Sequence, residues 1–116
     1  MHELSIGSAV LDTVVRHAAG RRVEVVYLRV GALRQVVPES LAFWFGLLAR
    51  ETVCEGARLE QELVPARLRC DGCATAWAAE VPAFRCPACG GAAVAVEQGE
   101  ELEVESIDVQ EARCTA

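Results

Sequence analysis

Four cysteines in two close pairs, Cys70-x2-Cys73 and Cys86-x2-Cys89, constrain the fold of this chain more than any other feature. Each pair can form a short turn that offers two thiolates to one ion, and two such turns complete the tetrahedral four-sulfur shell of a structural zinc site. Iron uses the same ligands and geometry, but nothing else here suggests electron transfer, so we favour zinc. Because four thiolates leave no open position for water or substrate, a zinc-dependent hydrolase is disfavoured.

The two remaining cysteines, Cys54 and Cys114, lie outside this pattern. We expect one buried small apolar side chain and one exposed thiol in the tail, with no catalytic role for either. The N-terminus lacks a basic start followed by an apolar run, and no apolar stretch approaches the ~20 residues of a membrane span. Cysteines in metal-binding spacing and the lack of a signal peptide predict a soluble cytoplasmic protein with reduced thiols.

The acidic charge of the chain argues against nucleic acid as a partner. The formal net charge is −6, and the basic residues are eleven scattered arginines with no lysine. Phosphate binding needs clustered positive charge, which this sequence lacks. The carboxylates of residues 97–111 have no basic neighbour in that segment. We interpret the row of Glu101, Glu103 and Glu105 as the solvated face of a strand.

Two helices and three strands are predicted outside the cysteine segment. Apolar residues at helical spacing predict a helix over 4–19, and Pro38 with Glu39 begins a second helix whose aromatic run we assign to the core. Strands are expected over 23–30, 59–64 and 101–110. The last strand needs a bulge near Ser106, because its apolar residues change phase there.

These elements predict an α+β fold, with two helices on a three-stranded sheet and an inserted zinc-ribbon-like domain that holds the four cysteines. Residues 1–65 plus 98–116 would form the α/β domain, and residues 66–97 would form the insert. Trp77 and Phe84 give the insert only a small apolar cluster. We therefore expect zinc binding and the folding of this segment to be coupled.

The chain has two histidines, and one of them is residue 2. The α-amine of Met1, the amide nitrogen of His2 and its imidazole can reach one cation through fused chelate rings. Several nitrogens in one plane suit nickel(II) or copper(II), and an extension before Met1 would convert the amine to an amide and remove a donor. The other histidine, His17, falls in the last turn of the first helix, where we assign it a structural role.

Short motifs along the whole chain then carry a family resemblance. They are Met1-His2-Glu3-Leu4, Val30-Gly31-Ala32-Leu33, Val37-Pro38-Glu39 with the Phe43-containing helix, the two cysteine pairs and Gly99-x-Glu101-Leu102. Together they resemble the HypA/HybF family of hydrogenase-maturation nickel chaperones.

The resemblance implies a nickel metallochaperone and no catalysis. It implies that the Met1 amine, His2 and backbone nitrogens including that of Glu3 bind nickel(II), and that structural zinc is held by Cys70, Cys73, Cys86 and Cys89. It also implies delivery of nickel to the precursor of a hydrogenase large subunit, alongside a maturation GTPase.

The residues leave other interpretations open. A zinc-ribbon interaction or regulatory module in which His2 is incidental is the main alternative, and the acidic surface would then favour a protein partner. Related chaperones also serve urease, and no residue separates the two recipients. A homodimer is equally open, since exchange of a strand or of the insert at Pro65 or Gly99 would leave no sequence signature.

Overall fold

The computed structural model of the chain describes residues 2–79 and 85–110. Its elements are α1 (His2–Ala18), β1 (Val23–Gly31), the 3-10 turn η1 (Ala32–Arg34), α2 (Pro38–Leu48), β2 (Arg58–Val64), β3 (Ala66–Cys70), β4 (Ala76–Ala79), β5 (Val94–Gln98) and β6 (Leu102–Val109). The strands form two three-stranded sheets, in the orders β2-β1-β6 and β4-β3-β5. The predicted α+β class is confirmed, as are both helices and the three strands expected outside the cysteine segment.

The described residues divide into two compact units. The helical unit comprises residues 2–28, 36–62 and 103–110, and the cysteine unit comprises residues 29–35, 63–79 and 85–102. The sequence predicted an α/β domain of residues 1–65 plus 98–116 and an inserted domain of residues 66–97. These boundaries stay a prediction. Among the described residues, neither helix is long and apolar enough to cross a membrane.

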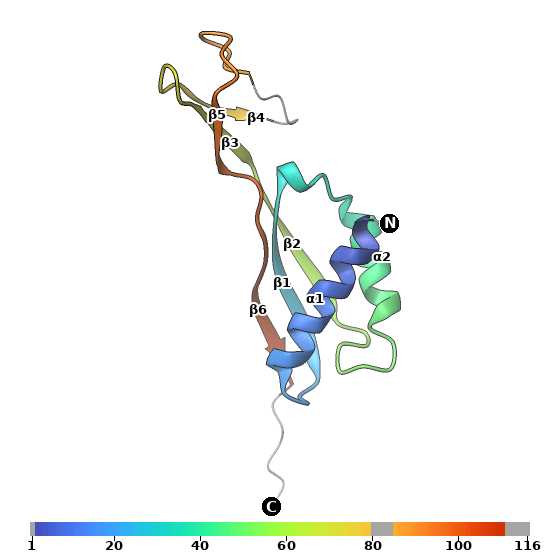
Figure 1. Cartoon of the computed structure of the whole chain (residues 1–116). Helices are drawn as coiled ribbons and strands as arrows, with labels where there is room; N and C mark the ends of the chain where they lie inside the picture. Colours follow the sequence, from blue (N-terminus) through green and yellow to red (C-terminus); the bar gives the residue numbers. More distant parts are fainter. Residues whose placement is uncertain (1, 80–84, 111–116) are drawn as a thin grey trace, which may run out of the picture. The chain divides into compact units, whose positions relative to one another are not determined.

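In the helical unit, α1 and α2 lie side by side over one face of the sheet (Figure 1). Val10, Val14 and Ala18 are buried along one side of α1, at the four-residue spacing that places side chains on one helix face. Phe45 of α2 and Leu28 of β1 are almost fully buried as well. The core of this unit therefore lies between the helices and the sheet.

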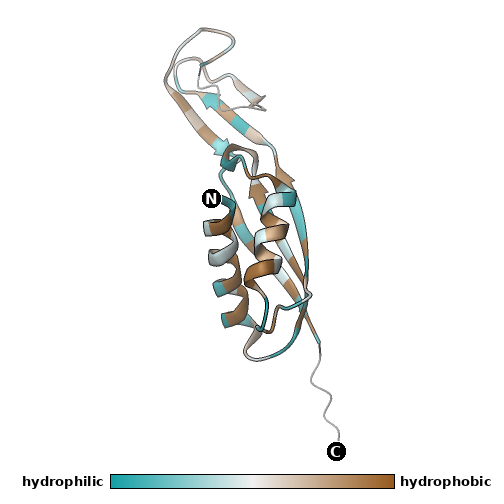
Figure 2. Ribbon diagram, turned by 90° about the vertical axis from the view of Figure 1, so that its right-hand side faces the viewer, coloured by the Kyte–Doolittle hydropathy of each residue, from teal (hydrophilic) through white to brown (hydrophobic). Residues whose placement is uncertain are grey.

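The second helix is less buried than the sequence predicted. Figure 2 shows that α2 is apolar along most of its length. Leu41 and Phe45 face the core, but Phe43 is 63% exposed and Leu47 is 39% exposed. The assignment of the whole aromatic run to the core is therefore wrong for Phe43, because α2 has more apolar residues than its one covered face accommodates.

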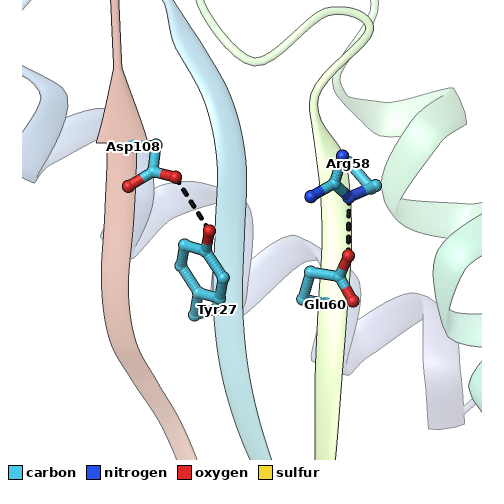
Figure 3. Close-up of polar contacts among 4 residues, drawn as sticks. All are labelled: Tyr27, Arg58, Glu60 and Asp108. Carbon is cyan, nitrogen blue, oxygen red and sulfur yellow. Dashed lines mark hydrogen bonds and ion pairs between the residues drawn. The ribbon is translucent and has the colours of Figure 1, made fainter.

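The sheet face that the helices leave uncovered is polar. Figure 3 shows the Tyr27 hydroxyl donating to Asp108 Oδ2 at 2.8 Å, and Arg58 Nε lying 2.6 Å from Glu60 Oε1. The bond to Asp108 raises the pKa of the Tyr27 phenol above its ordinary value.

Strand β6 changes phase along its length, as the sequence predicted. Glu105 and Ser106 are both exposed, and they separate two half-buried apolar pairs, Leu102 with Val104 and Ile107 with Val109.

In the cysteine unit, β3 is the central strand and pairs antiparallel with both neighbours. Leu68 is fully buried and lies opposite Trp77 of β4 and Val96 of β5. This small sheet was not predicted from the sequence, because β4 is mostly alanine, a weak strand former. Phe84, which we expected beside Trp77, lies outside the described residues.

Candidate metal centres

The two cysteine pairs come together at one end of the small sheet. The Sγ atoms of Cys70, Cys73, Cys86 and Cys89 all lie within 4.8 Å of one another. The Cys70 and Cys89 sulfurs are 3.6 Å apart, and those of Cys73 and Cys86 are 3.5 Å apart. Tetrahedral zinc with bonds of about 2.3 Å would place its sulfurs ~3.8 Å apart, so these four residues fit a zinc ion.

Backbone hydrogen bonds shape the first cysteine turn. The Cys70 N–H donates to the carbonyl of Thr75 at 2.8 Å, and the Ala74 N–H donates back to the Cys70 carbonyl at 2.9 Å. Ala74 closes the turn with a φ of 62°, in the left-handed region that alanine rarely adopts. The turn thus directs both cysteine side chains toward the same point.

The second cysteine turn repeats the pattern of the first. The Cys86 N–H donates to Gly91 at 3.0 Å, the Gly90 N–H donates to the Cys86 carbonyl at 2.9 Å, and Gly90 has a φ of 73°. The Cys86 sulfur also accepts weak hydrogen bonds from the N–H groups of Ala88 and Cys89. Two turns of the same construction therefore face one another, as their common spacing in the sequence predicted.

The four thiols differ in exposure and acidity. Cys70 and Cys86 are buried, whereas Cys73 and Cys89 lie at the exposed edge. Hydrogen bonds from the side chain and backbone of Thr75 lower the pKa of Cys73 to about 6. The Gly91 N–H lowers the pKa of Cys89, but the three neighbouring cysteine thiols raise it by more, so that the pKa of Cys89 is about 11. Thr75 therefore favours the thiolate form of Cys73, which is the form that binds metal.

The N-terminal candidate residues lie in the first turn of α1, which begins at His2. The first four N–H groups of a helix have no acceptor within the helix, so the backbone nitrogens of His2 and Glu3 are not used by α1 itself. The His2 side chain is exposed. Met1 lies outside the described residues, so the set of Met1, His2 and Glu3 as nickel ligands stays a prediction.

The Glu3 side chain has a role that the sequence did not reveal. Its Oε2 accepts a hydrogen bond from the Val37 N–H at 3.2 Å, and this bond lowers the pKa of the Glu3 carboxyl. Val37 is the residue directly before α2. The contact thus holds the first turn of α1 against the start of α2. Thr75 beside Cys73 is the second residue whose role the sequence did not indicate.

The cysteines outside the cluster fit the sequence prediction as far as they are described. Cys54 is fully buried, and burial raises the pKa of its thiol. It is a small apolar side chain of the core with no metal-binding neighbour among the described residues. Cys114 lies outside the described residues.

Comparison with known proteins places these features in a family. Residues 1–109 match the family described as "Hydrogenase/urease nickel incorporation, metallochaperone, hypA". The hydrogenase maturation factor HypA of Streptomyces avermitilis is 45% identical, with 100% of this chain and 92% of the relative covered. The protein of the same description from Geotalea uraniireducens is 43% identical over 95% of this chain and its own full length.

A solved structure shows the same fold. The solution structure of the Ni metallochaperone HypA from Helicobacter pylori matches with a TM-score of 0.69 at 23% identity, covering 94% of this chain and 97% of that one. The family match and the curated relatives together confirm the resemblance seen in the sequence. This chain belongs to the HypA family of metallochaperones for hydrogenase and urease nickel incorporation.

Proposed function

We propose that the chain carries nickel(II) at its N-terminus and delivers it to the large-subunit precursor of a nickel-iron hydrogenase. The observation that carries the proposal is the position of His2, exposed in the first turn of α1 within a member of this family. The ligands would be the Met1 amine, the His2 imidazole and amide nitrogen, and the Glu3 amide nitrogen. Nitrogen donors in a plane suit the tetragonal preference of nickel(II).

The first helical turn makes these amide nitrogens available. An amide nitrogen binds nickel(II) only after it loses its proton, and an amide that donates to a carbonyl in a helix resists this loss. The N–H groups of His2 and Glu3 have no carbonyl acceptor within α1. The bond from the Val37 N–H to the Glu3 carboxylate holds this turn in place. Protonation of the same nitrogens would release the ion to a recipient.

Zinc would have a structural role in this function. Cys70, Cys73, Cys86 and Cys89 would hold it, and when bound it supplies a crosslink between the two cysteine turns. The small core around Leu68 gives this unit little apolar burial of its own. We infer that the zinc-bound unit presents a fixed surface to partner proteins, namely a nickel-handling maturation GTPase and the hydrogenase precursor. The chain would work in the cytoplasm, where thiols stay reduced, and without catalysis of its own.

Hydrogenase maturation in cells that lack their own HypA tests the proposal. We expect the wild-type chain and His17→Ala to restore hydrogenase activity, and His2→Ala to restore at most about a tenth of it, because the loss of one chelating ligand weakens binding at least tenfold. Urease activity in the same cells identifies the recipient. Full activity with His2→Ala would favour the alternative, a zinc-ribbon interaction module that does not carry nickel.

A further inference from the structure

The two cysteine turns are built alike but differ at one position. Thr75 and Gly91 each lie two residues after the second cysteine of their pair. The Thr75 carbonyl accepts from the Cys70 N–H at 2.8 Å, and the Gly91 carbonyl accepts from the Cys86 N–H at 3.0 Å. The two residues therefore hold equivalent places in the two turns, and only the first of them has a side chain.

The side chain of Thr75 adds a contact to the exposed sulfur of its turn. The backbone N–H groups of Thr75 and Gly91 donate to the sulfurs of Cys73 and Cys89, respectively. In the first turn, Thr75 Oγ1 also lies 3.2 Å from Cys73 Sγ. A thiolate has no proton to donate, so in the metal-binding form the Thr75 hydroxyl is the donor. Cys73 thus accepts a hydrogen bond for which Gly91 has no equivalent.

The local structure holds the Thr75 hydroxyl beside Cys73. Thr75 is half-buried, and its backbone carbonyl and N–H are both used in the turn. Its β-branched side chain has few rotamers to choose from, so little entropy is lost in placing the hydroxyl. Thr75 is also the one serine, threonine or tyrosine between residues 63 and 102. The hydroxyl contact in the cysteine unit therefore depends on this residue.

The two exposed cysteines differ in what covers them. Cys70 and Cys86 are buried, so Cys73 and Cys89 are the sulfurs that a reagent in solution can reach. A Cβ added at Gly91 would lie 3.2 Å from the Cys89 sulfur and 4.0 Å from the Cys70 sulfur, with no other described atom within 4 Å. The place that the Thr75 side chain takes beside Cys73 is therefore open beside Cys89.

We propose that Cys89 is the thiolate of this site that reacts first with a soft electrophile, and that Thr75 is a positioning residue that protects Cys73. The proposal rests on the zinc-binding role proposed above. In the reaction with iodoacetamide, the sulfur forms a bond to the methylene carbon, and iodide leaves with the electron pair of the carbon–iodine bond. Cys73 must give up its hydrogen bond from Thr75 to attack in this way, which slows its reaction at least about tenfold.

Reaction at Cys89 would act on the whole cysteine unit. A thiolate binds metal strongly because of its negative charge, and an alkylated sulfur has lost that charge. Three thiolates would remain, and the link between the two turns would be weakened. Cys89 is therefore the point at which an electrophile can open this site, because the other three sulfurs are buried or protected.

Limited alkylation of the zinc-loaded, untagged chain tests the proposal. The protein is treated with less than one equivalent of iodoacetamide at neutral pH, and tandem mass spectrometry gives the ratio of label at Cys89 to label at Cys73. We expect a ratio of at least about ten in the wild type. Thr75→Val keeps the shape of the side chain without its hydroxyl, and should bring the ratio close to one by raising the label at Cys73.

Two further variants separate the hydroxyl from a general effect on folding. Thr75→Ser keeps the hydroxyl and should restore the wild-type ratio. Thr13→Val removes a hydroxyl that donates to the Ala9 carbonyl within α1, and should leave the ratio unchanged. Zinc content is measured for each protein before labelling.

The wild-type ratio needs no variant and can overturn the proposal alone. Equal labelling of the two cysteines, or faster labelling of Cys73, with one zinc per chain would overturn it and leave the zinc site standing. A ratio that stays high in Thr75→Val would overturn the role of Thr75. A wild type that holds no zinc would overturn the zinc site together with this proposal.

Discussion

Replacing Cys70 by serine is expected to abolish zinc binding and to unfold the cysteine unit. The Cys70 sulfur is buried among the other three cysteine sulfurs, so its loss opens the metal shell. Zinc binding contributes about 10 kcal/mol or more to the folding of small zinc domains, and the core around Leu68 cannot replace it. Elemental analysis should show a fall from one zinc per chain to none, and amide spectra should show loss of the dispersed signals of β3, β4 and β5.

Cys54→Ala is the matched control for this experiment. It also removes a buried thiol, but one that lies in the helical unit and outside the cluster. We expect it to retain one zinc per chain and an intact cysteine unit. If Cys70→Ser kept its zinc and its β3–β5 signals, the four-cysteine site would not be the zinc site of this protein.

Gly31→Ala is expected to be the most destabilising glycine substitution in the chain. The backbones of Gly31 and Gly99 cross so closely that an added Cβ would overlap the Gly99 carbonyl and lie 2.6 Å from the Glu100 nitrogen. The crossing is fixed by hydrogen bonds from Gly31 N–H to the Glu101 carbonyl and from Leu33 N–H to the Gly99 carbonyl. Because backbone atoms cannot move aside, we expect a loss of about 3 kcal/mol or more.

The measurement for Gly31→Ala is the thermal unfolding of the zinc-loaded protein, where we expect the midpoint to fall by about 10 °C or more. Gly7→Ala is the control, since Gly7 is also buried but a Cβ there meets its neighbours at ordinary distances of 3.6 Å and above. That variant should stay within about 1 kcal/mol of the wild type, because alanine favours the helix. Equal stabilities for the two variants would contradict the close crossing.

The cysteine cluster was predictable from the sequence because it depends on a local pattern, the spacing within each cysteine pair. Two residues between paired cysteines dictate a turn, and both turns have the expected construction around Cys70 and Cys86. The helices and the β6 phase change were also predictable, since burial on one face determines their periodicity. The small sheet was not predictable, because pairing of β4 with β3 depends on contacts such as Leu68 with Trp77 and not on strand propensity.

Two other features depend on packing between distant segments. The hydrogen bond between Glu3 and Val37 joins residues 34 positions apart, and no local pattern indicates it. The exposure of Phe43 was also missed, because periodicity shows that a helix face is apolar but not whether anything covers it. The sequence alone therefore identified candidate ligands, and the structure adds how the residues around them are held.

A nickel titration by calorimetry on the zinc-loaded, untagged protein decides whether the N-terminus is the nickel site. The wild type would be compared with His2→Ala, with a version extended before Met1, and with His17→Ala as the matched control, since His17 is the other histidine and is exposed in the last turn of α1. We expect one nickel per chain for the wild type and His17→Ala. We expect at least about a tenfold loss of affinity for His2→Ala and for the extended chain, with zinc retained in all four. Equal nickel binding by all four proteins would show that His2 and the free amine do not hold the ion.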